Sequence, residues 1–341
     1  MPTTSPWPQR ESGCAARLCP VITALLCALL LAPPAAAQNA KAAYPSRPLH
    51  LVVPQTPGGA VDLVARMLAD RIEVLLGCTV VVENRPGANG IIGTEAVKNA
   101  APDGYTLLAA SSSTHAMAPH TMTRIPYDAL GDFVPIVNVA YTTKVVMVHP
   151  TLPVRTLAEF IRYARERPGL LNYGSTGRGS STDLDVQLFA AATQLQFVHV
   201  PYRGAPQANT ALVNNEVQLV LGSLTTALGL LQSGRLRALA VVSDRRSPLL
   251  PDVPTIGEAG LPGFEVQTWI GLVAPAGTPE PIVAKLTRAV NEVLRQAATR
   301  RWMGDLGLVG IGGSARDFDQ RLRADYATWG EAVRRLALQP E

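Results

Sequence analysis

A glycine-rich loop at residues 172–185, NYGSTGRGSSTDLD, has a composition suited to binding an anion. It follows an apolar run, and Leu184, Leu188 and Ala191 recur after it at helical spacing. Backbone N–H groups at the start of a helix have no partner within the helix, and the helix dipole adds partial positive charge there. Glycine lets an anion approach closely. We therefore expect ligand contacts from Ser175, Thr176, Gly177, Gly179, Ser180 and Ser181.

One such loop is too weak to hold a ligand alone. The helix dipole contributes about 0.3–1 kcal/mol and a hydrogen bond to a charged group about 1.5–3 kcal/mol. A micromolar complex needs about 8 kcal/mol. Several donors must therefore converge from more than one side, and the sequence offers a second glycine turn, PQTPGG at residues 54–59.

Both turns also have a purely structural interpretation. A glycine turn between a strand and a helix is often only a connection, and hydroxyl residues at a helix start are often caps. Asp62 and Asp183 fall at the beginnings of their predicted helices, where an acidic side chain complements the dipole. Because one such turn occurs in each half of the chain, a shared binding cleft is favoured.

The two turns occupy matching places in a repeated succession of elements. Residues 49–53, 80–82 and 105–109 are short apolar runs typical of strands, and helical patterns over 61–75 and 91–100 separate them. The same β-α-β-α-β order returns in the second half of the chain. Its elements are residues 170–173, 184–191, 197–200, 208–215 and 217–221.

The repeat predicts an α/β fold with two lobes, each a mostly parallel sheet flanked by helices. Ligands of such sheets lie outside the carboxyl ends of the strands, so the cleft and a hinge should lie between the lobes. We expect lobe 1 to comprise residues 44–147 plus 268–341, and lobe 2 residues 148–267. The other predicted cleft residues are Gln55, Gly58, Gly59, Val61, Asp62, Ser111, Thr114, Arg203, Gly204 and Ser223.

The N-terminal region has the features of a secretory signal. Arginines precede an apolar run at residues 21–32, which is too short to span a bilayer, and small residues follow it up to Ala37. We predict that residues 1–37 are a cleaved signal peptide and that the protein is periplasmic. A lipid anchor at Cys27 is the alternative, although a bulky leucine precedes it where a small residue is expected.

The composition argues against several kinds of partner. The 341 residues are 47% hydrophobic and 16% charged, with a formal net charge of +4, which is typical of a globular protein. No block of like charges and no basic helix face occurs in the sequence after the signal. Binding to nucleic acid or to a membrane surface is therefore not expected.

Several stretches resemble the signatures of one protein family. In chain order they are YPSRP (44–48), PQTPGGAVD (54–62), VENRPGA (82–88), APDGYTLL (101–108), LNY (171–173), HVPYRG (199–204), LRALAV (236–241), DVPT (252–255) and LVAPAGTP (272–279). Together they are similar to the substrate-binding receptors of tripartite tricarboxylate transporters, often called Bug proteins. The similarity covers essentially the whole chain after the signal.

The resemblance implies a two-lobed periplasmic-binding-protein fold, type II-like, that closes about a hinge on a small carboxylate. It implies that the loop around residues 175–181 holds a ligand carboxylate and that residues 55–62 approach from the other side, partly through water. The ligand would be a mono-, di- or tricarboxylate or an aromatic acid, and the partner a two-subunit membrane permease. An orphan receptor that feeds a regulatory system is the alternative. We expect a monomer without cofactor or metal.

The chain departs from the family pattern at several of these positions. Val61 replaces a usual threonine, Gln55 a common aromatic residue and Asp183 a common histidine, and Gly222-Ser223 replaces a frequent Asp-Asn pair. Without an acidic residue near position 222, a ligand ammonium would lack a natural partner. We therefore hypothesise a ligand that is not an amino acid.

Catalysis is a competing class with little support in the sequence. Gly177-Arg178-Gly179 begins like a dinucleotide fingerprint, but its third glycine is missing. There is no Gly-x-Ser-x-Gly, no phosphate-binding P-loop and no His-Glu-x-x-His, and the five histidines lack metal-ligand spacing. We therefore predict that the protein is not an enzyme. A purely structural exported domain would bind no small ligand at all.

Overall fold

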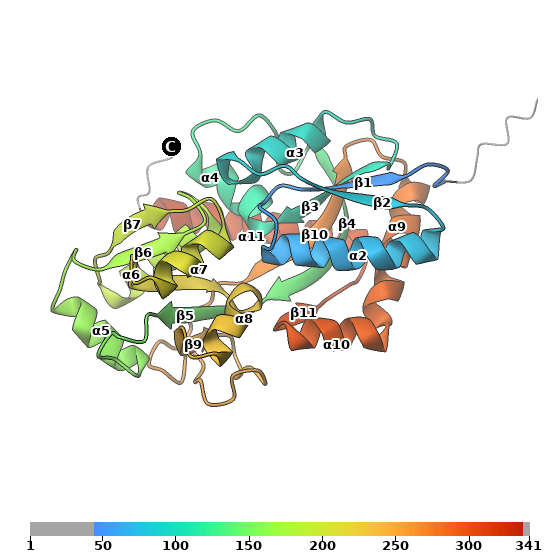
Figure 1. Cartoon of the computed structure of the whole chain (residues 1–341). Helices are drawn as coiled ribbons and strands as arrows, with labels where there is room; N and C mark the ends of the chain where they lie inside the picture. The colour runs from blue at the N-terminus through green and yellow to red at the C-terminus, as the bar shows by residue number, and fades with distance from the viewer. Residues whose placement is uncertain (1–43, 337–341) are drawn as a thin grey trace, which may run out of the picture. The chain divides into compact units, whose positions relative to one another are not determined.

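Two mixed β-sheets with helices on their faces make up residues 44–336, the part of the chain that the computed structural model describes. The predicted signal peptide at residues 1–37 and the alternative anchor at Cys27 lie outside the described residues. We call each sheet with its own helices a lobe (Figure 1).

The first lobe contains a six-stranded sheet. Its strands are β1 (Leu49–Val53), β2 (Val80–Asn84), β3 (Thr106–Ser111), β4 (Phe133–Thr142), β10 (Thr268–Pro275) and β11 (Leu308–Gly310), in the order β11-β4-β10-β3-β1-β2. Its helical segments are α2 (Ala60–Leu76), η1 (Ala88–Gly90), α3 (Ile91–Lys98), η2 (Ser113–Met117), α4 (Ala118–Thr121), α9 (Glu280–Arg295), α10 (Ala297–Asp305) and α11 (Ala315–Arg335).

The second lobe contains a five-stranded sheet. Its strands are β5 (Lys144–Val148), β6 (Asn172–Ser175), β7 (Val198–Pro201), β8 (Leu219–Ser223) and β9 (Arg237–Val242), in the order β7-β6-β8-β5-β9. Its helices are α5 (Leu157–Arg165), α6 (Ser181–Thr193), α7 (Ala205–Val213) and α8 (Leu224–Gln232).

The α/β class is confirmed, but the expectation of mostly parallel sheets is wrong. Only the β-α-β-α-β part of each lobe is parallel: β1 pairs with β2 and β3, and β6 with β7 and β8. The other strands, β4, β10 and β11 in one sheet and β5 and β9 in the other, pair antiparallel. The repeat in the sequence therefore predicted the parallel part of each sheet. The antiparallel strands complete the two sheets.

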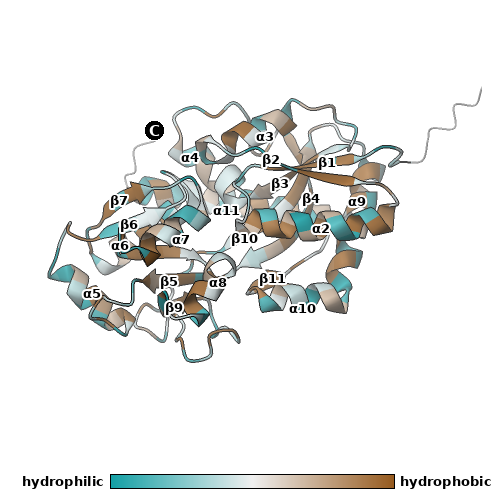
Figure 2. Cartoon of the chain, viewed as in Figure 1, coloured by the Kyte–Doolittle hydropathy of each residue, from teal (hydrophilic) through white to brown (hydrophobic). Residues whose placement is uncertain are grey.

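Several apolar runs of the sequence form inner strands, such as β1 and β3. Leu51 in β1 lies opposite Val82 on one side and Leu107 on the other, and Leu51 and Leu107 are buried. Helices cover both faces of such strands, which explains their nearly continuous apolar sequences. Figure 2 shows these strands as predominantly hydrophobic, whereas a covering helix such as α2 carries both polar and apolar residues.

Three segments link the lobes. The chain passes from β4 to β5 at Thr143 and returns between β9 and β10 over residues 243–267. Helix α11 is the third link, because Phe318 belongs to a first-lobe core cluster while Trp329 belongs to the cluster that contains Phe189 of α6. Within residues 44–336, none of the helices combines the length and apolar character that a membrane crossing requires.

Gly271 in β10 provides a test of this packing. Phe318 of α11 lies over Gly271, and a Cβ at this position would overlap the Phe318 ring. The buried Trp269 packs edge-on against the same ring, with centroids 5.0 Å apart, so the ring has little room to move. We expect Gly271→Ala to lower the free energy of unfolding by about 1–3 kcal/mol, which is typical of overpacking. Urea denaturation would measure the change.

A matched control lies in helix α8. A Cβ at Gly229 would meet nothing within 4 Å. Gly229→Ala should therefore raise the free energy of unfolding by about 0.5–1 kcal/mol, because alanine loses less backbone entropy in a helix. Equal stability of the two variants would contradict this account of the core.

Candidate functional site

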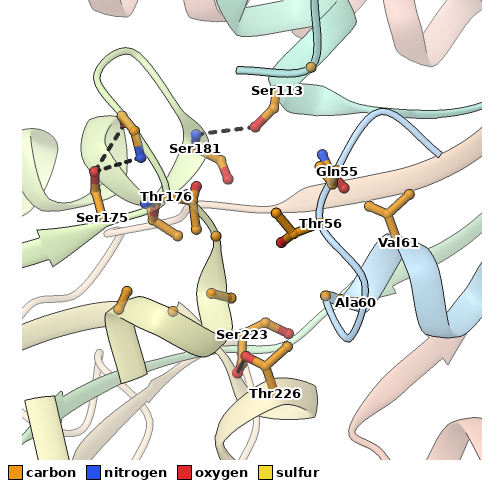
Figure 3. A pocket seen from close by; sticks show the side chains of 18 of the residues that line it. Gln55, Thr56, Ala60, Val61, Ser113, Ser175, Thr176, Ser181, Ser223 and Thr226 are labelled. Carbon is orange, nitrogen blue, oxygen red and sulfur yellow. Dashed lines mark hydrogen bonds between the residues drawn. The ribbon is translucent and has the colours of Figure 1, made fainter. Parts of the chain in front are cut away.

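Turns from both lobes meet around one cavity of about 570 Å³. Residues 54–56 follow β1, residues 175–177 follow β6, and residues 203–205 follow β7, so the lining comes from the carboxyl ends of strands in both sheets. Figure 3 shows Gln55 and Thr56 on one side of this cavity and Ser175 and Thr176 on the other. The volume falls within the range of about 300–1,000 Å³ found for small-molecule sites.

Three helices begin at the cavity without a side-chain cap. The N-cap residues are Gly59 for α2, Gly204 for α7 and Ser223 for α8, and none of them makes a side-chain cap hydrogen bond. The Ser223 hydroxyl is buried and has no hydrogen-bond partner among the described residues. This hydroxyl and first-turn N–H groups are therefore available to a ligand, except that the Leu224 N–H donates to the Thr143 carbonyl and Pro206 has no N–H.

The charge of the lining favours an anion. Lys144 and Arg203 line the cavity, and none of the described lining residues is acidic. Arg203 is exposed, whereas only 2% of Lys144 is accessible to solvent. A carboxylate in this cavity would meet positive charge and hydroxyl or N–H donors, and a ligand ammonium would meet no carboxylate.

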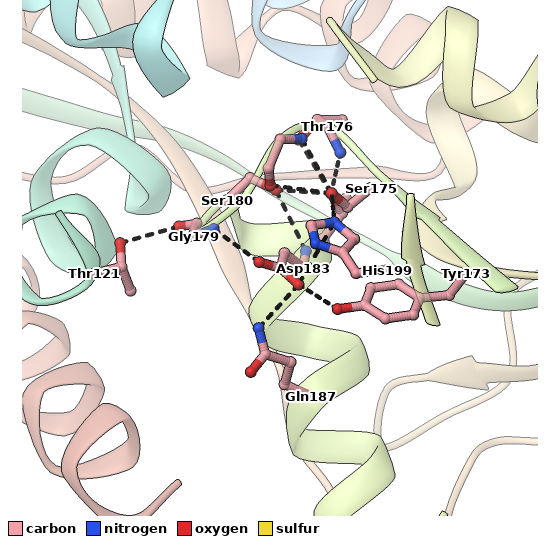
Figure 4. A network of polar contacts seen from close by, with 11 residues as sticks. Thr121, Tyr173, Ser175, Thr176, Gly179, Ser180, Asp183, Gln187 and His199 are labelled. Carbon is pink, nitrogen blue, oxygen red and sulfur yellow. Dashed lines mark hydrogen bonds and ion pairs between the residues drawn. The ribbon is translucent and has the colours of Figure 1, made fainter. Parts of the chain in front are cut away.

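The glycine loop already holds an anion that belongs to the protein itself. The Asp183 carboxylate accepts the Gly179 N–H at 2.8 Å, the Gln187 amide at 2.9 Å and the Tyr173 hydroxyl at 2.5 Å (Figure 4). Only 2% of Asp183 is exposed. These donors stabilise its buried charge, and burial beside this charge raises the pKa of Tyr173.

The other N–H groups of the loop donate to protein oxygens as well. They pair Thr176 with Thr182 Oγ1, Gly177 with Ser175 Oγ, Ser180 with the Gly177 carbonyl, and Ser181 with Ser113 Oγ. The expectation that this loop offers free N–H groups is therefore wrong for these residues. Its sequence does bring donors together around an anion, but the anion is Asp183.

Most of the predicted site residues line the cavity. The others take part in hydrogen bonds that hold the lining turns in place. The predicted residues in the lining are Gln55, Gly59, Val61, Ser111, Ser175, Thr176, Gly177, Ser181, Arg203, Gly204 and Ser223. The predicted residues outside it are Gly58, Asp62, Thr114, Gly179 and Ser180.

Hydrogen bonds explain why these five residues lie outside the lining. Asp62 accepts the Gly58 N–H and closes the turn before α2. Thr114 Oγ1 accepts the Ser111 N–H, and Ser180 is the N-cap of α6. Gly179 donates to Asp183, behind the cavity wall. Asp62 and Asp183 therefore stabilise helix starts, as the structural interpretation of the two turns predicted, and neither residue lines the cavity.

Sequence reasoning missed several lining residues. Lys144 and Asn89 are the most informative, and only Lys144 carries a signal in the sequence. Lys144 is a lone charge in the otherwise apolar strand KVVMV, and a lysine is rarely buried without a specific role. Asn89 and Ala88 adopt left-handed φ angles of 55° and 44°, a conformation that costs energy outside glycine and often marks functional sites.

The lobes touch across the mouth of the cavity. Thr56 of the first lobe packs against Gly204 of the second so closely that a Cβ at Gly204 would overlap the Thr56 hydroxyl. On another side, Thr121 Oγ1 donates to the Gly179 carbonyl at 3.3 Å. Together with the bond from Ser181 to Ser113, these contacts join the two lobes beside the cavity.

The polar network near Ser175 contains serine, histidine and aspartate but lacks the geometry of a catalytic triad. Ser175 Oγ lies 2.6 Å from His199 Nε2, and the same nitrogen lies 3.8 Å from Asp183. A triad uses opposite ring nitrogens for these two contacts. His115 is buried against Phe133, and burial lowers its pKa to about 3.

Metal ligands do not cluster in the described structure. Over residues 44–336, no group of three or more histidine, cysteine, aspartate or glutamate side chains is placed to hold a metal ion.

Comparison with known proteins identifies similar sequences and folds. Residues 64–338 match the model of the tripartite tricarboxylate transporter family receptor. BugT of Bordetella pertussis is 38% identical over 283 residues, which is 83% of this chain and 86% of BugT. A protein of R. palustris solved with adipate is 34% identical with a TM-score of 0.85, and the match covers 87% of this chain and all of that one. MatC from Rhodopseudomonas palustris with bound malate is 33% identical with a TM-score of 0.81, over 85% of this chain and all of MatC.

Substitution of Asp183 tests whether its carboxylate holds the glycine loop in its conformation. Asp183→Asn removes the charge and turns one acceptor atom into a donor that would face an N–H group. We expect the free energy of unfolding to fall by about 2–3 kcal/mol, the size of a lost hydrogen bond to a charged group. Glu166→Gln, in an exposed pair with Arg167, should change it by at most about 1 kcal/mol. If chemical denaturation gave the same value for both variants, Asp183 would not organise the loop.

Proposed function

Since the chain belongs to the tripartite tricarboxylate transporter receptor family, we propose that it captures a small carboxylate in the cavity between its lobes. The family is one of receptors, and the chain is accordingly a receptor and not an enzyme. The observation that carries the proposal is the composition of the cavity lining. The lining combines two cations with uncapped helix starts, and none of the described lining residues is acidic. The complexes of related proteins with adipate and malate support the same ligand class.

Binding is proposed to work by closure of the lobes about a hinge. Ligand contacts would come from the lining residues of both lobes, with Gln55, Ser111 and Ser223 as the side chains that set specificity. Closure removes water from the cavity, which strengthens each hydrogen bond to the carboxylate. Opening would release the ligand to its next partner.

The location and partner form a second part of the proposal. The signal sequence at residues 1–37 would send the chain to the periplasm, where it would act as a monomer. The family description implies delivery of the bound acid to a membrane transporter, and we propose a two-subunit permease as the partner.

A ligand panel tests the proposed function. We expect calorimetry of the purified protein to show saturable binding of adipate, malate or a related acid such as benzoate. At 100 times the Kd, binding stabilises the folded state by about 2.7 kcal/mol. This should raise the Tm by about 4 °C. Aspartate and glutamate should not bind, because the lining offers no acidic partner for their ammonium groups. Tight binding of these two amino acids, with none of the simple acids, would refute the proposal.

Gly204 tests whether the contact with Thr56 belongs to the binding-competent state. Gly204→Val forces the two lobes apart at the mouth of the cavity. We expect a loss of affinity of at least about tenfold, or 1.4 kcal/mol, for the acid that the panel identifies. The free energy of unfolding should change by less than about 1 kcal/mol, because both residues lie in turns.

The matched control is Gly304→Val in α10, where a Cβ meets nothing within 4 Å. It should bind as the original chain does. An unchanged Kd for Gly204→Val in calorimetry would show that this contact plays no part in binding.

A further inference from the structure

A buried ion pair lies at the wall of the cavity. Lys144 Nζ donates to Asp185 Oδ2 at 2.7 Å, and 3% of the lysine side chain and none of the aspartate side chain is exposed. Lys144 lines the cavity, and Asp185 does not. A molecule inside the cavity would therefore contact Lys144 and not Asp185.

The ammonium has capacity for a second partner. A lysine carries three donors, and the close contact with Asp185 uses one of them. Ser181 Oγ lies 3.5 Å away, at the outer limit of a hydrogen bond. A buried ammonium with so few partners is costly, since charge taken out of water needs hydrogen bonds in its place.

Neighbouring hydroxyls extend this polar region. Lys144 in β5 is the direct cross-strand partner of Ser223 in β8, so the two side chains leave the same face of the sheet. The buried Ser223 hydroxyl has no partner among the described residues, and Asp185 Oδ1 has none either. The Ser223 hydroxyl, on the same face of the sheet as Lys144, can therefore donate to a carboxylate that contacts Lys144.

We propose that Lys144 binds one carboxylate of the solute, with Ser223 beside it, and that Asp185 takes up a proton from solvent when the carboxylate binds. This inference rests on the proposed function and names the group in the cavity that recognises the ligand charge. It follows from the occupied glycine loop, because Asp183 leaves that loop with few donors for a ligand anion.

The titration of Asp185 fits this role. Burial raises its pKa to about 6, although Lys144 opposes the shift. The charged or titratable groups facing it are Lys144 on β5 and Asp183 on its own helix, with Tyr173 of β6 and His199 of β7 beyond Asp183. A ligand carboxylate on Lys144 would raise this pKa further, so binding takes up a proton. Affinity is then full below about pH 6 and falls as the pH rises through the pKa of the complex.

Charge variants with opposite expected effects test the proposal. Calorimetry at pH 7.5 would use adipate, malate and acetate as probes. We expect Lys144→Met to weaken binding of the probe that binds best by at least about 30-fold. Asp185→Asn should tighten it about three- to tenfold, because the ammonium then faces no competing charge. Lys144→Met/Asp185→Leu should remain weak, and it keeps the test decisive if the single lysine variant fails to fold.

A pH series and a distant ion pair provide the controls. From pH 6 to pH 8 the original chain should lose affinity severalfold relative to Asp185→Asn, which has no proton to gain. Lys98→Met and Asp132→Asn alter a partly exposed Lys–Asp pair outside the cavity lining, and both should bind as the original chain does.

The outcomes separate this inference from the proposed function. If the original chain binds a probe and the double variant binds it equally well, or if Asp185→Asn weakens binding, the ion pair is only structural and the receptor function stands. If the original chain binds neither the three probes nor any other acid of the panel, benzoate included, both proposals are overturned.

Discussion

The buried carboxylate of Asp183 fixes the glycine loop on which this side of the cavity depends. It accepts hydrogen bonds from Gly179, Gln187 and Tyr173, and these donors stabilise a charge that has almost no access to water. The backbone of the glycine loop, which could have bound a ligand anion, is thereby ordered around the carboxylate of Asp183. The negative charge of a solute has to be met elsewhere, and the cavity provides Lys144 and the uncapped starts of α2, α7 and α8 for this purpose.

The links between the lobes restrict how the cavity could open. The two chain crossings are irregular segments without a helix or a named strand, but α11 places Phe318 in one core and Trp329 and Val333 in another. A helix that packs in both cores resists separation of the lobes, because separation would expose apolar surface on one face of the helix. Beside the cavity the lobes are also joined by the packing of Thr56 against Gly204 and by the hydrogen bonds from Thr121 to Gly179 and from Ser181 to Ser113, which an opening motion would have to break.

Local patterns in the sequence predicted the features that depend on residues close together in the chain. Apolar runs and glycine turns located the parallel strands and the turns after them, which is why residues such as Gln55 and Ser175 were placed at the cavity. The antiparallel pairing of β4 with β10, and of β5 with β8 and β9, could not be predicted in this way, because it joins distant segments. The role of Asp183 and the pairing of Lys144 with Asp185 likewise depend on side chains that meet only after folding.

The balance of charge in the cavity also bears on selectivity. An ammonium carried into this cavity would be buried near Lys144, with no carboxylate among the described lining residues to pair with it. Asp185 could not serve that role, since it lies outside the lining and already accepts from Lys144. Like charge at short range in a medium of low dielectric is strongly unfavourable. In the proposed binding mode the same lysine would attract a carboxylate and repel an ammonium, so one buried cation would provide both recognition of the acid and discrimination against its amino derivative.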